Sequence, residues 1–185
     1  QKLGYNAFYC CDKLAVININ GNFTWSEDWL SENPFGLLNE IEKITNTNPN
    51  FVIEDGALYN SQKTILFRVP VKQLELLLPS TLKYVAANAC RHCRYIPSIQ
   101  FPKSIEYIGK GAFCDCKSIR EIEIPTTITN ILDSCFALCY HLAHLKLHEG
   151  IEEMHCDAFR GCSELEFIDY PKGHEVRMNQ LLRSA

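Results

Sequence analysis

The chain has 185 residues, of which 46% are hydrophobic and 22% are charged, an ordinary composition for a single folded domain over residues 1–185. Its net charge of −4 gives no electrostatic basis for binding nucleic acid or an anionic membrane. No apolar run approaches the roughly 20 residues of a membrane-spanning helix, and no signal peptide is visible.

Residues 1–20 are predicted to be part of a repeat unit that ends in a short strand. The alternation in Val16-Ile17-Asn18-Ile19 is typical of a strand with one buried face. The residues before it match a unit found later in the chain: Leu3, Gly4, Ala7, Phe8 and Cys11 correspond to Ile108, Gly109, Ala112, Phe113 and Cys116. The first half of this unit is missing, and a solenoid normally has a cap at each end. We therefore expect the chain to be a piece of a longer protein, or to begin after a removed segment.

Residues 21–73 are predicted to be an insertion. Ile19 and Leu78 occupy equivalent positions of the unit but lie 59 residues apart, 36 more than the 23-residue period described below. Residues 21–34 are rich in turn-forming residues, and residues 35–45 are expected to form either a short helix or an irregular lead into a strand. Residues 51–69 are predicted to form strands around an Asp55-Gly56 turn.

Both tryptophans of the chain, Trp25 and Trp29, lie in this insertion. Insertions in repeat proteins often belong to the binding surface, and tryptophan is favoured among the residues that dominate binding energy. Both residues are therefore candidates for contact with a partner. The alternative is that they pack the insertion onto the rest of the chain.

Residues 74–171 contain the regular repeat. Cys93, Cys116, Cys139 and Cys162 follow one another at intervals of 23 residues, and a fixed period of this length indicates one structural unit stacked on itself. Apolar columns share the period: Leu82, Ile105, Ile128 and Ile151; Val85, Ile108, Ile131 and Met154; Cys90, Phe113, Phe136 and Phe159; Ile99, Ile122, Leu145 and Ile168. Parallel strands from successive coils are expected to form one sheet, and the segment around each cysteine to turn the chain back.

The unit resembles the BspA-type, or Treponema pallidum-type, leucine-rich repeat, which runs roughly L-x-x-I-G-x-x-A-F-x-x-C-x-x-L-x-x-I-x-I-P. Residues 105–125, IEYIGKGAFCDCKSIREIEIP, match it almost column by column. The resemblance covers residues 1–20 and 74–171. We therefore expect an α/β repeat solenoid, a leucine-rich repeat superhelix with a parallel β-sheet on one face and an inserted loop plus β-hairpin element.

The resemblance also implies a class of function. It points to surface or secreted proteins of bacteria and some protozoa that serve adhesion and protein binding, without catalytic residues or a cofactor. The expected function is a non-enzymatic protein-binding or adhesion module, at the cell surface or secreted, with a protein partner. The alternatives are a structural spacer within a longer chain, and a zinc- or redox-responsive protein that uses the extra cysteines.

Ten cysteines in one chain of this length need an explanation. Five of them occupy the interior turn position of the unit, where a thiol acts as a small buried hydrophobe: Cys11, Cys93, Cys116, Cys139 and Cys162. Parallel strands about 4.7–4.9 Å apart would hold equivalent Cβ atoms farther apart than the roughly 3.8 Å of a disulfide, so this column is expected to stay reduced. Zinc is the alternative, with ligands drawn from Cys90-Arg91-His92-Cys93 and Cys114-Asp115-Cys116, although the repeat already accounts for two of these cysteines.

The histidines give no catalytic or metal-binding pattern. His141, His144 and His148 have helical spacing, but the register of the repeat places one after the turn, one outward from a strand and one in the proline column. No Gly-rich phosphate loop, G-x-S-x-G or H-E-x-x-H occurs. The sequence therefore predicts no enzymatic activity, no metal and no cofactor.

The outward positions of the expected sheet follow from the same register. They are Val16 and Asn18, Glu75 and Leu77, Ser98 and Gln100, Glu121 and Glu123, His144 and Lys146, and Phe167 and Asp169. The opposite charges among them either stabilise neighbouring strands or recognise a partner, for which Leu77 and Phe167 would be anchors. The candidate partner-binding residues are Trp25, Trp29, Leu77, Gln100, Glu121, Glu123, His144, Lys146, Phe167 and Asp169.

Residues 172–185 break the period. They are predicted either to cap the last coil, with Val176, Leu181 and Leu182 over its edge, or to be a tail. With this segment the single leucine-rich repeat domain has four parts: residues 1–20, 21–73, 74–171 and 172–185.

Overall fold

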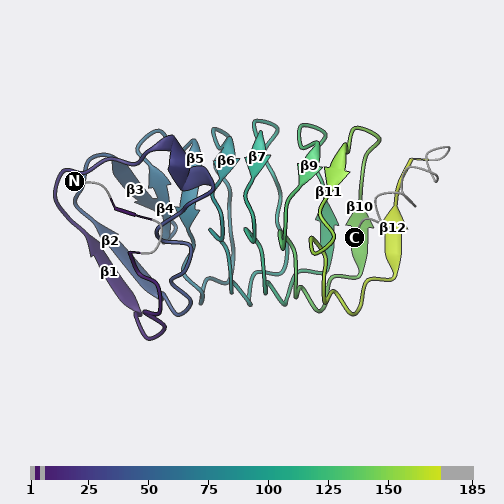
Figure 1. The fold of residues 1–185 in the computed structure, drawn as a ribbon, viewed down its shortest axis with the longest axis horizontal. Coiled ribbons are helices and arrows are strands. Elements are labelled where there is room, and N and C mark those ends of the chain that lie inside the picture. The colour runs from purple at the N-terminus through teal and green to yellow at the C-terminus, as the bar shows by residue number, and fades with distance from the viewer. Residues whose placement is uncertain (1–2, 5–6, 172–185) are drawn as a thin grey trace.

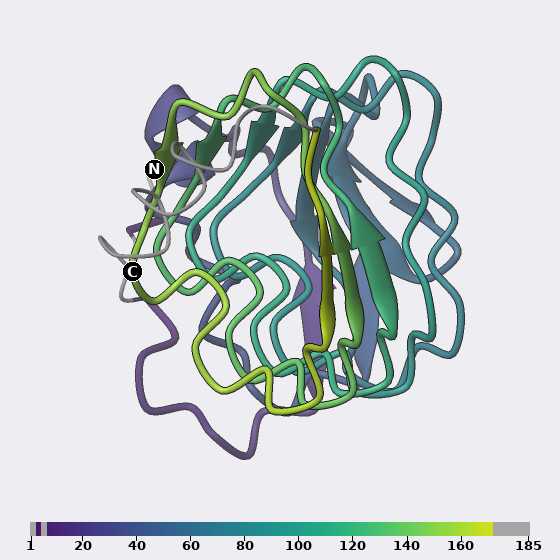
Figure 2. The same cartoon turned by 90° about the vertical axis from the view of Figure 1, so that its right-hand side faces the viewer.

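Stacked coils form an elongated solenoid (Figure 1) in the structure, a computed structural model that describes residues 3–4 and 7–171. Viewed along its length, the coils lie one behind another, so that their strands line up (Figure 2). The cap predicted for residues 172–185 lies outside the described residues, as do Val176, Leu181 and Leu182.

Short strands dominate the described part of the chain. They are β1 (Val16–Ile19), β2 (Lys43–Asn46), β3 (Phe51–Glu54), β4 (Ala57–Asn60), β5 (Ile65–Arg68), β6 (Tyr84–Val85), β7 (Tyr107–Ile108), β8 (Glu121–Glu123), β9 (Asn130–Ile131), β10 (His144–Lys146), β11 (Glu153–Met154) and β12 (Phe167–Asp169). The α/β class is not confirmed, because the 3-10 helix η1 (Glu27–Leu30) is the one helical segment among residues 3–4 and 7–171.

One side of the solenoid carries the parallel sheet β8–β10–β12. Ile122, Leu145 and Ile168 are partners in the register of its strands, and the first two are almost fully buried. The residues on either side of them face outward, as the alternation in the sequence predicts.

A second column of strands runs along the other side of the same coils. β6 and β7 pair in parallel, and so do β9 and β11, at the same 23-residue spacing. The expectation of one sheet was therefore wrong. These strands are two residues long, which is too short for a period-2 pattern to indicate a strand in the sequence.

The third side of each coil is a turn that stacks on its neighbour. The rings of Phe113 and Phe136 are stacked at 5.5 Å, and those of Phe136 and Phe159 at 5.4 Å. Backbone amides of one turn donate to carbonyls of the next, as Cys90 N does to Ala112 O at 2.8 Å. Each buried ring contributes roughly 1.5–3 kcal/mol by its removal from water, so the column holds successive coils together.

The segment 21–73 contains part of the solenoid as well as a hairpin. β2 pairs in parallel with β1, with Ile44 opposite Ile17, so β2 continues the stack of coils. The expectation that residues 21–73 are an inserted loop plus β-hairpin is therefore not confirmed. Residues 35–42 lead irregularly into β2, which is the second of the two alternatives for this stretch. The predicted hairpin β3–β4 is confirmed, with the left-handed Asp55 (φ 48°) and Gly56 (φ 82°) in its turn.

Arg68 ties this hairpin region to the coils. β4 is antiparallel to β5, which in turn is parallel to β6, so the hairpin extends the second column of strands. At the end of β5, the fully buried guanidinium of Arg68 donates to the carbonyl oxygens of Leu38 (2.6 Å) and Asn88 (2.8 Å). Burial lowers the pKa of Arg68, and these carbonyl dipoles take the place that a carboxylate would have in an ion pair.

Candidate protein-interaction surface

The outward face of the β8–β10–β12 sheet brings six of the predicted residues together. In the strand register, His144 lies between Glu121 and Phe167, and Lys146 lies between Glu123 and Asp169. All six side chains are exposed. We call these six residues the sheet face: Glu121, Glu123, His144, Lys146, Phe167 and Asp169.

Lys146 is the electrostatic centre of the sheet face. Its Nζ lies 2.9 Å from Oε1 of Glu121 and 3.8 Å from Oε2 of Glu123. The hydrogen bond with Glu121 raises the pKa of Lys146, and the same bond lowers the pKa of Glu121. Because these groups are open to water, the pairs add little to stability, and their charges remain accessible to a partner.

An aromatic pair lies beside these charges. The rings of His144 and Phe167 are stacked, with centroids 4.8 Å apart and an angle of 15° between their planes. Phe167 nevertheless keeps 56% of its surface exposed. Protein interfaces favour aromatic rings at their centre and place charged groups such as Lys and Glu at their polar rim.

A groove interrupts the same side of the solenoid farther toward the N-terminus. Leu77 and Gln100, both predicted to face outward, line it, together with Leu74, Glu75, Leu76, Leu78, Pro97 and Ser98. Its volume is ≈ 520 Å³, and Leu74 and Leu77 are 72% and 64% exposed. Leu74 was not among the predicted residues, because it lies before the alternating part of its unit.

The two tryptophans lie elsewhere and are not both available to a partner. Trp29 is only 4% exposed, and its ring packs against Phe35, Phe51 and Phe67 at centroid distances of 5.6–6.1 Å. Its prediction as a contact residue was wrong, because the apolar ring closes the core of the N-terminal part. Trp25 is half-buried against Phe67, at 6.1 Å.

The repeated cysteines form a column of buried thiols. Cys116, Cys139 and Cys162 donate to the carbonyl oxygens of Cys90 (3.1 Å), Phe113 (3.3 Å) and Phe136 (3.2 Å) in the preceding coil. Burial raises the pKa of Cys93 to about 12 and that of Cys162 to about 11. These groups therefore stay protonated at neutral pH and are weak nucleophiles.

The residues considered for zinc in the sequence are not gathered into one site. The thiol of Cys93 points to the backbone oxygen of Val69, and Nδ1 of His92 lies 2.8 Å from Oδ2 of Asp115. Burial lowers the pKa of His92, an effect that this contact with Asp115 opposes. Cys90 and Cys116 are fully buried, and burial raises the pKa of both well above the ordinary value.

The three histidines at helical spacing are also separate. Nδ1 of His141 lies 2.8 Å from Oε1 of Glu164, whereas His144 belongs to the sheet face. His148 accepts the amide of Gly150 at Nδ1, so its Nε2 carries the proton and donates to the carbonyl of Ile128 at 3.0 Å. Each histidine therefore has its own partner.

Comparisons with known proteins agree with the repeated coils of the fold. The model of the BspA type leucine rich repeat region matches residues 1–75 and 70–181 in six copies. No curated protein matches the sequence. Within the described part of the chain, none of the helical structure has the length and hydropathy of a membrane span.

Solved structures share the fold. A leucine rich cell surface protein from Faecalibacterium prausnitzii is 23% identical with a TM-score of 0.68, over 91% of this chain and 50% of that one. A leucine-rich repeat protein from Eubacterium ventriosum is 24% identical with a TM-score of 0.64, over 83% of this chain and 48% of that one. This chain thus spans half or less of the length of either. From the match over its sequence and the repeated coils of its structure, the chain belongs to the BspA-type leucine-rich repeat family.

Proposed function

We propose that the chain is a protein-binding module that holds its partner on the sheet face and in the adjoining groove. The observation that carries this proposal is the exposed Phe167, stacked on His144 beside the charged cluster of Lys146. A large apolar ring that is fixed in place costs little entropy on binding, and the nearby charges supply orientation.

The groove extends this surface. Leu74 and Leu77 are the most exposed large aliphatic side chains among the described residues, and Gln100 provides a polar group across from them. A partner that covers both regions would use apolar anchors at two points with charged contacts between them. The parallel stacking of the coils keeps these points at a fixed separation.

We further propose that the function is adhesion without catalysis, at the cell surface or after secretion. The family supports this proposal, together with the description of the Faecalibacterium prausnitzii structure as a cell surface protein. Labelling of intact cells with an antibody to the chain tests the location. Labelling that appears only after the cells are opened would contradict it.

Interferometry against a panel of purified extracellular proteins tests the binding face. For a partner found in this way, Phe167→Ala and Lys146→Glu should each weaken binding at least about tenfold, as loss of a central contact does. Tyr9→Ala and Lys103→Glu are matched controls, because both residues are exposed and lie outside the sheet face and the groove. Unchanged binding in both sheet-face variants, or a panel without any binder, would contradict the proposal.

A further inference from the structure

The turn that follows β11 differs from the equivalent turns of the preceding coils. In those coils the corresponding residues, Asn88, Gly111 and Ser134, have a left-handed backbone with φ of 56–62°. Asp157, one period after Ser134, is absent from the residues with positive φ. The amide of Asp157 instead donates to Nδ1 of His155 at 3.1 Å.

This altered turn gathers side chains that normally diverge. Ligand atoms of the three consecutive residues His155, Cys156 and Asp157 all lie within 4.8 Å of one another. Sγ of Cys156 is 3.7 Å from Nδ1 of His155. Among the described residues, this is the one group of three or more such side chains with a spacing suited to a metal ion.

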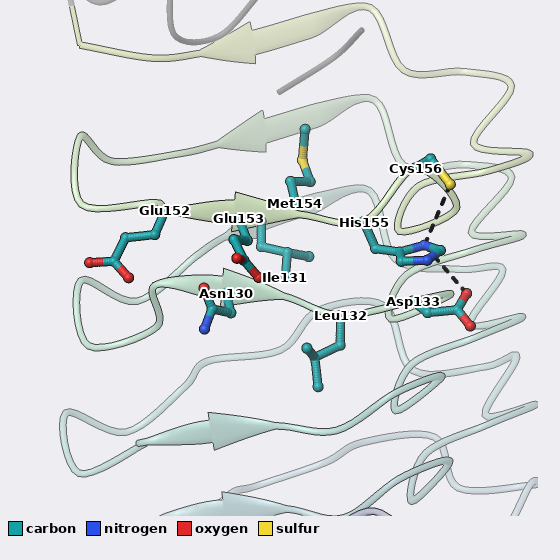
Figure 3. Close-up of a pocket in the computed structure, with 9 residues that line it drawn as sticks. All are labelled: Asn130, Ile131, Leu132, Asp133, Glu152, Glu153, Met154, His155 and Cys156. Carbon is teal, nitrogen blue, oxygen red and sulfur yellow. Dashed lines mark hydrogen bonds and ion pairs between the residues drawn. The ribbon is translucent and has the colours of Figure 1, made fainter. Parts of the chain in front are cut away.

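A fourth donor comes from the coil below. Asp133 stands one 23-residue period before Cys156, and its Oδ1 lies 3.7 Å from Nδ1 of His155. Figure 3 shows the side chains of Asp133, His155 and Cys156 pointing toward one another where the turns leave β9 and β11. The same three residues line an open pocket of ≈ 440 Å³, through which an ion reaches them from solvent.

The distances fit a tetrahedral zinc ion. Zn–S bonds of about 2.3 Å and Zn–N bonds of about 2.0–2.1 Å, at a tetrahedral angle, place the sulfur and nitrogen about 3.5 Å apart. A carboxylate oxygen at a similar bond length lies about 3.3 Å from the nitrogen. Both observed separations from Nδ1 of His155 are 3.7 Å, whereas the ligand atoms of His155, Cys156 and Asp157 lie within 4.8 Å of one another. These three side chains therefore turn inward to reach tetrahedral distances, and Asp133, which is outside that group of three, moves farther.

The chemical state of these groups also suits a metal. Because Nδ1 of His155 accepts the amide of Asp157, this nitrogen carries no proton, and a metal ion can take its lone pair in place of that hydrogen bond. The carboxylates now contact surface cations, Asp133 with Lys110 and Asp157 with Arg160 at 3.6 Å. The cation of each pair is open to water, which weakens the pair, so a doubly charged ion can replace it. The Oδ1 of Asp133 also accepts a hydrogen bond from Oγ of Ser134 at 2.8 Å.

We propose that His155, Cys156, Asp157 and Asp133 form a binding site for a zinc-class transition-metal ion that joins two adjacent coils. The thiol of Cys156 loses its proton to solvent on binding and becomes a thiolate ligand. No equivalent cluster of three ligands can form one, two or three coils earlier, because the corresponding positions hold Leu132-Asp133-Ser134, Gly109-Lys110-Gly111 and Ala86-Ala87-Asn88. The site lies where the chain leaves β9 and β11, and none of its residues belongs to the sheet face.

Cobalt titration tests the site directly. The reduced chain, without a polyhistidine tag, should bind one equivalent of Co²⁺ with the near-ultraviolet absorption of a cobalt–thiolate bond, and Zn²⁺ should displace it. Cys156→Ser and His155→Gln should abolish this absorption. Cys10→Ser is the matched control, because Cys10 is also exposed and belongs to no such cluster among residues 3–4 and 7–171.

Two further results decide the proposal. Asp133→Asn should weaken cobalt binding at least about tenfold, and Zn²⁺ should raise the melting temperature of the parent chain but not of Cys156→Ser. The proposal is overturned if no cobalt–thiolate absorption appears, if it persists in Cys156→Ser, or if it disappears in Cys10→Ser. Unchanged affinity in Asp133→Asn would overturn the link between two coils.

Discussion

The Sγ atom of Cys139 lies 3.3 Å from the carbonyl oxygen of Phe113, in the coil before it. The same relationship joins Cys116 to Cys90 and Cys162 to Phe136. The cysteine of the repeat is thus more than a small apolar filler, because its thiol bonds one coil to the preceding one.

Removal of one of these thiols should weaken the stack. Cys139→Ala is expected to lower the free energy of unfolding by about 1–3 kcal/mol, since it removes a hydrogen bond and leaves a void. Urea denaturation followed by circular dichroism measures the change. Cys10→Ala, at an exposed position, should stay within about 0.5 kcal/mol of the parent, and equal effects of the two substitutions would contradict this role.

The buried thiols should also make stability fall at alkaline pH. Burial raises the pKa of Cys162 to about 11 and that of Cys93 to about 12, whereas an unfolded cysteine ionises at about 8.5. Above that pH the unfolded chain binds fewer protons than the folded chain, so the free energy of unfolding decreases as pH rises.

Urea denaturation at a series of pH values measures this decrease. Stability should change little between about pH 7 and pH 8 and then fall by up to about 1.4 kcal/mol per pH unit for each thiol involved. Burial raises the pKa of Cys139 as well, so Cys139→Ala should show a shallower decline. A parent chain equally stable at about pH 8 and pH 10 would contradict the prediction.

Arg68 should be a major contributor to the stability of the N-terminal part. Arg68→Met removes a charged donor from the carbonyls of Leu38 and Asn88, which keep the amides of Ile41 and Arg91 as donors, so a loss of about 1–3 kcal/mol is expected. Arg120→Met, on an exposed side chain, is the matched control. Denaturation midpoints that move equally in the two variants would show that the guanidinium stabilises nothing specific.

Two glycines of the same repeat column should respond differently to a methyl group. A Cβ on Gly109 would meet the backbone nitrogen of Ala87 at 2.6 Å, whereas a Cβ on Gly4 has no neighbour within 4 Å. Gly109→Ala is expected to cost about 1–3 kcal/mol of stability by overpacking, and Gly4→Ala close to nothing. Thermal melting of the two variants side by side checks this, and a neutral Gly109→Ala would mean that the coils separate more easily than their spacing indicates.

Trp29 should contribute more to the stability of the fold than Trp25. Trp29→Ala removes a ring packed among three phenylalanines and is expected to destabilise by about 3–5 kcal/mol. The emission of Trp29 in the parent should be blue-shifted, because its environment is apolar. A red-shifted emission from a Trp25→Phe variant, in which Trp29 is the remaining tryptophan, would contradict the buried position.

The sequence was sufficient to predict features that follow the 23-residue period and features set by the residue types of a single turn. The 23-residue period placed Ile122 and Leu145 inward and Glu121 and Lys146 outward, and the strand register agrees. The hairpin turn at Asp55-Gly56 was readable because a left-handed backbone strongly favours these residue types.

Other features depend on packing over long distances and left no local pattern. β2 follows its equivalent strand by 27 residues instead of 23, so the period failed to reveal it. Trp29 is buried by Phe51 and Phe67, which lie 22 and 38 residues later, and no rule of spacing distinguishes such a core residue from an exposed one. The cluster at His155 was missed because consecutive residues rarely share one site, and only the altered turn brings them together.

The contacts between coils all run in the same direction along the axis of the solenoid. This determines how the chain can become longer or shorter. Each turn offers the same set of groups to the one after it: a carbonyl oxygen for the next thiol, a ring face for the next phenylalanine and backbone amides for the next turn. Gain or loss of a whole 23-residue unit therefore preserves these contacts in the regular coils, whereas a shift of register between two coils would separate each thiol, ring and amide from its counterpart. Duplication of single units can lengthen the molecule in steps of about 4.8 Å, because each added coil makes the same interior contacts as its neighbours.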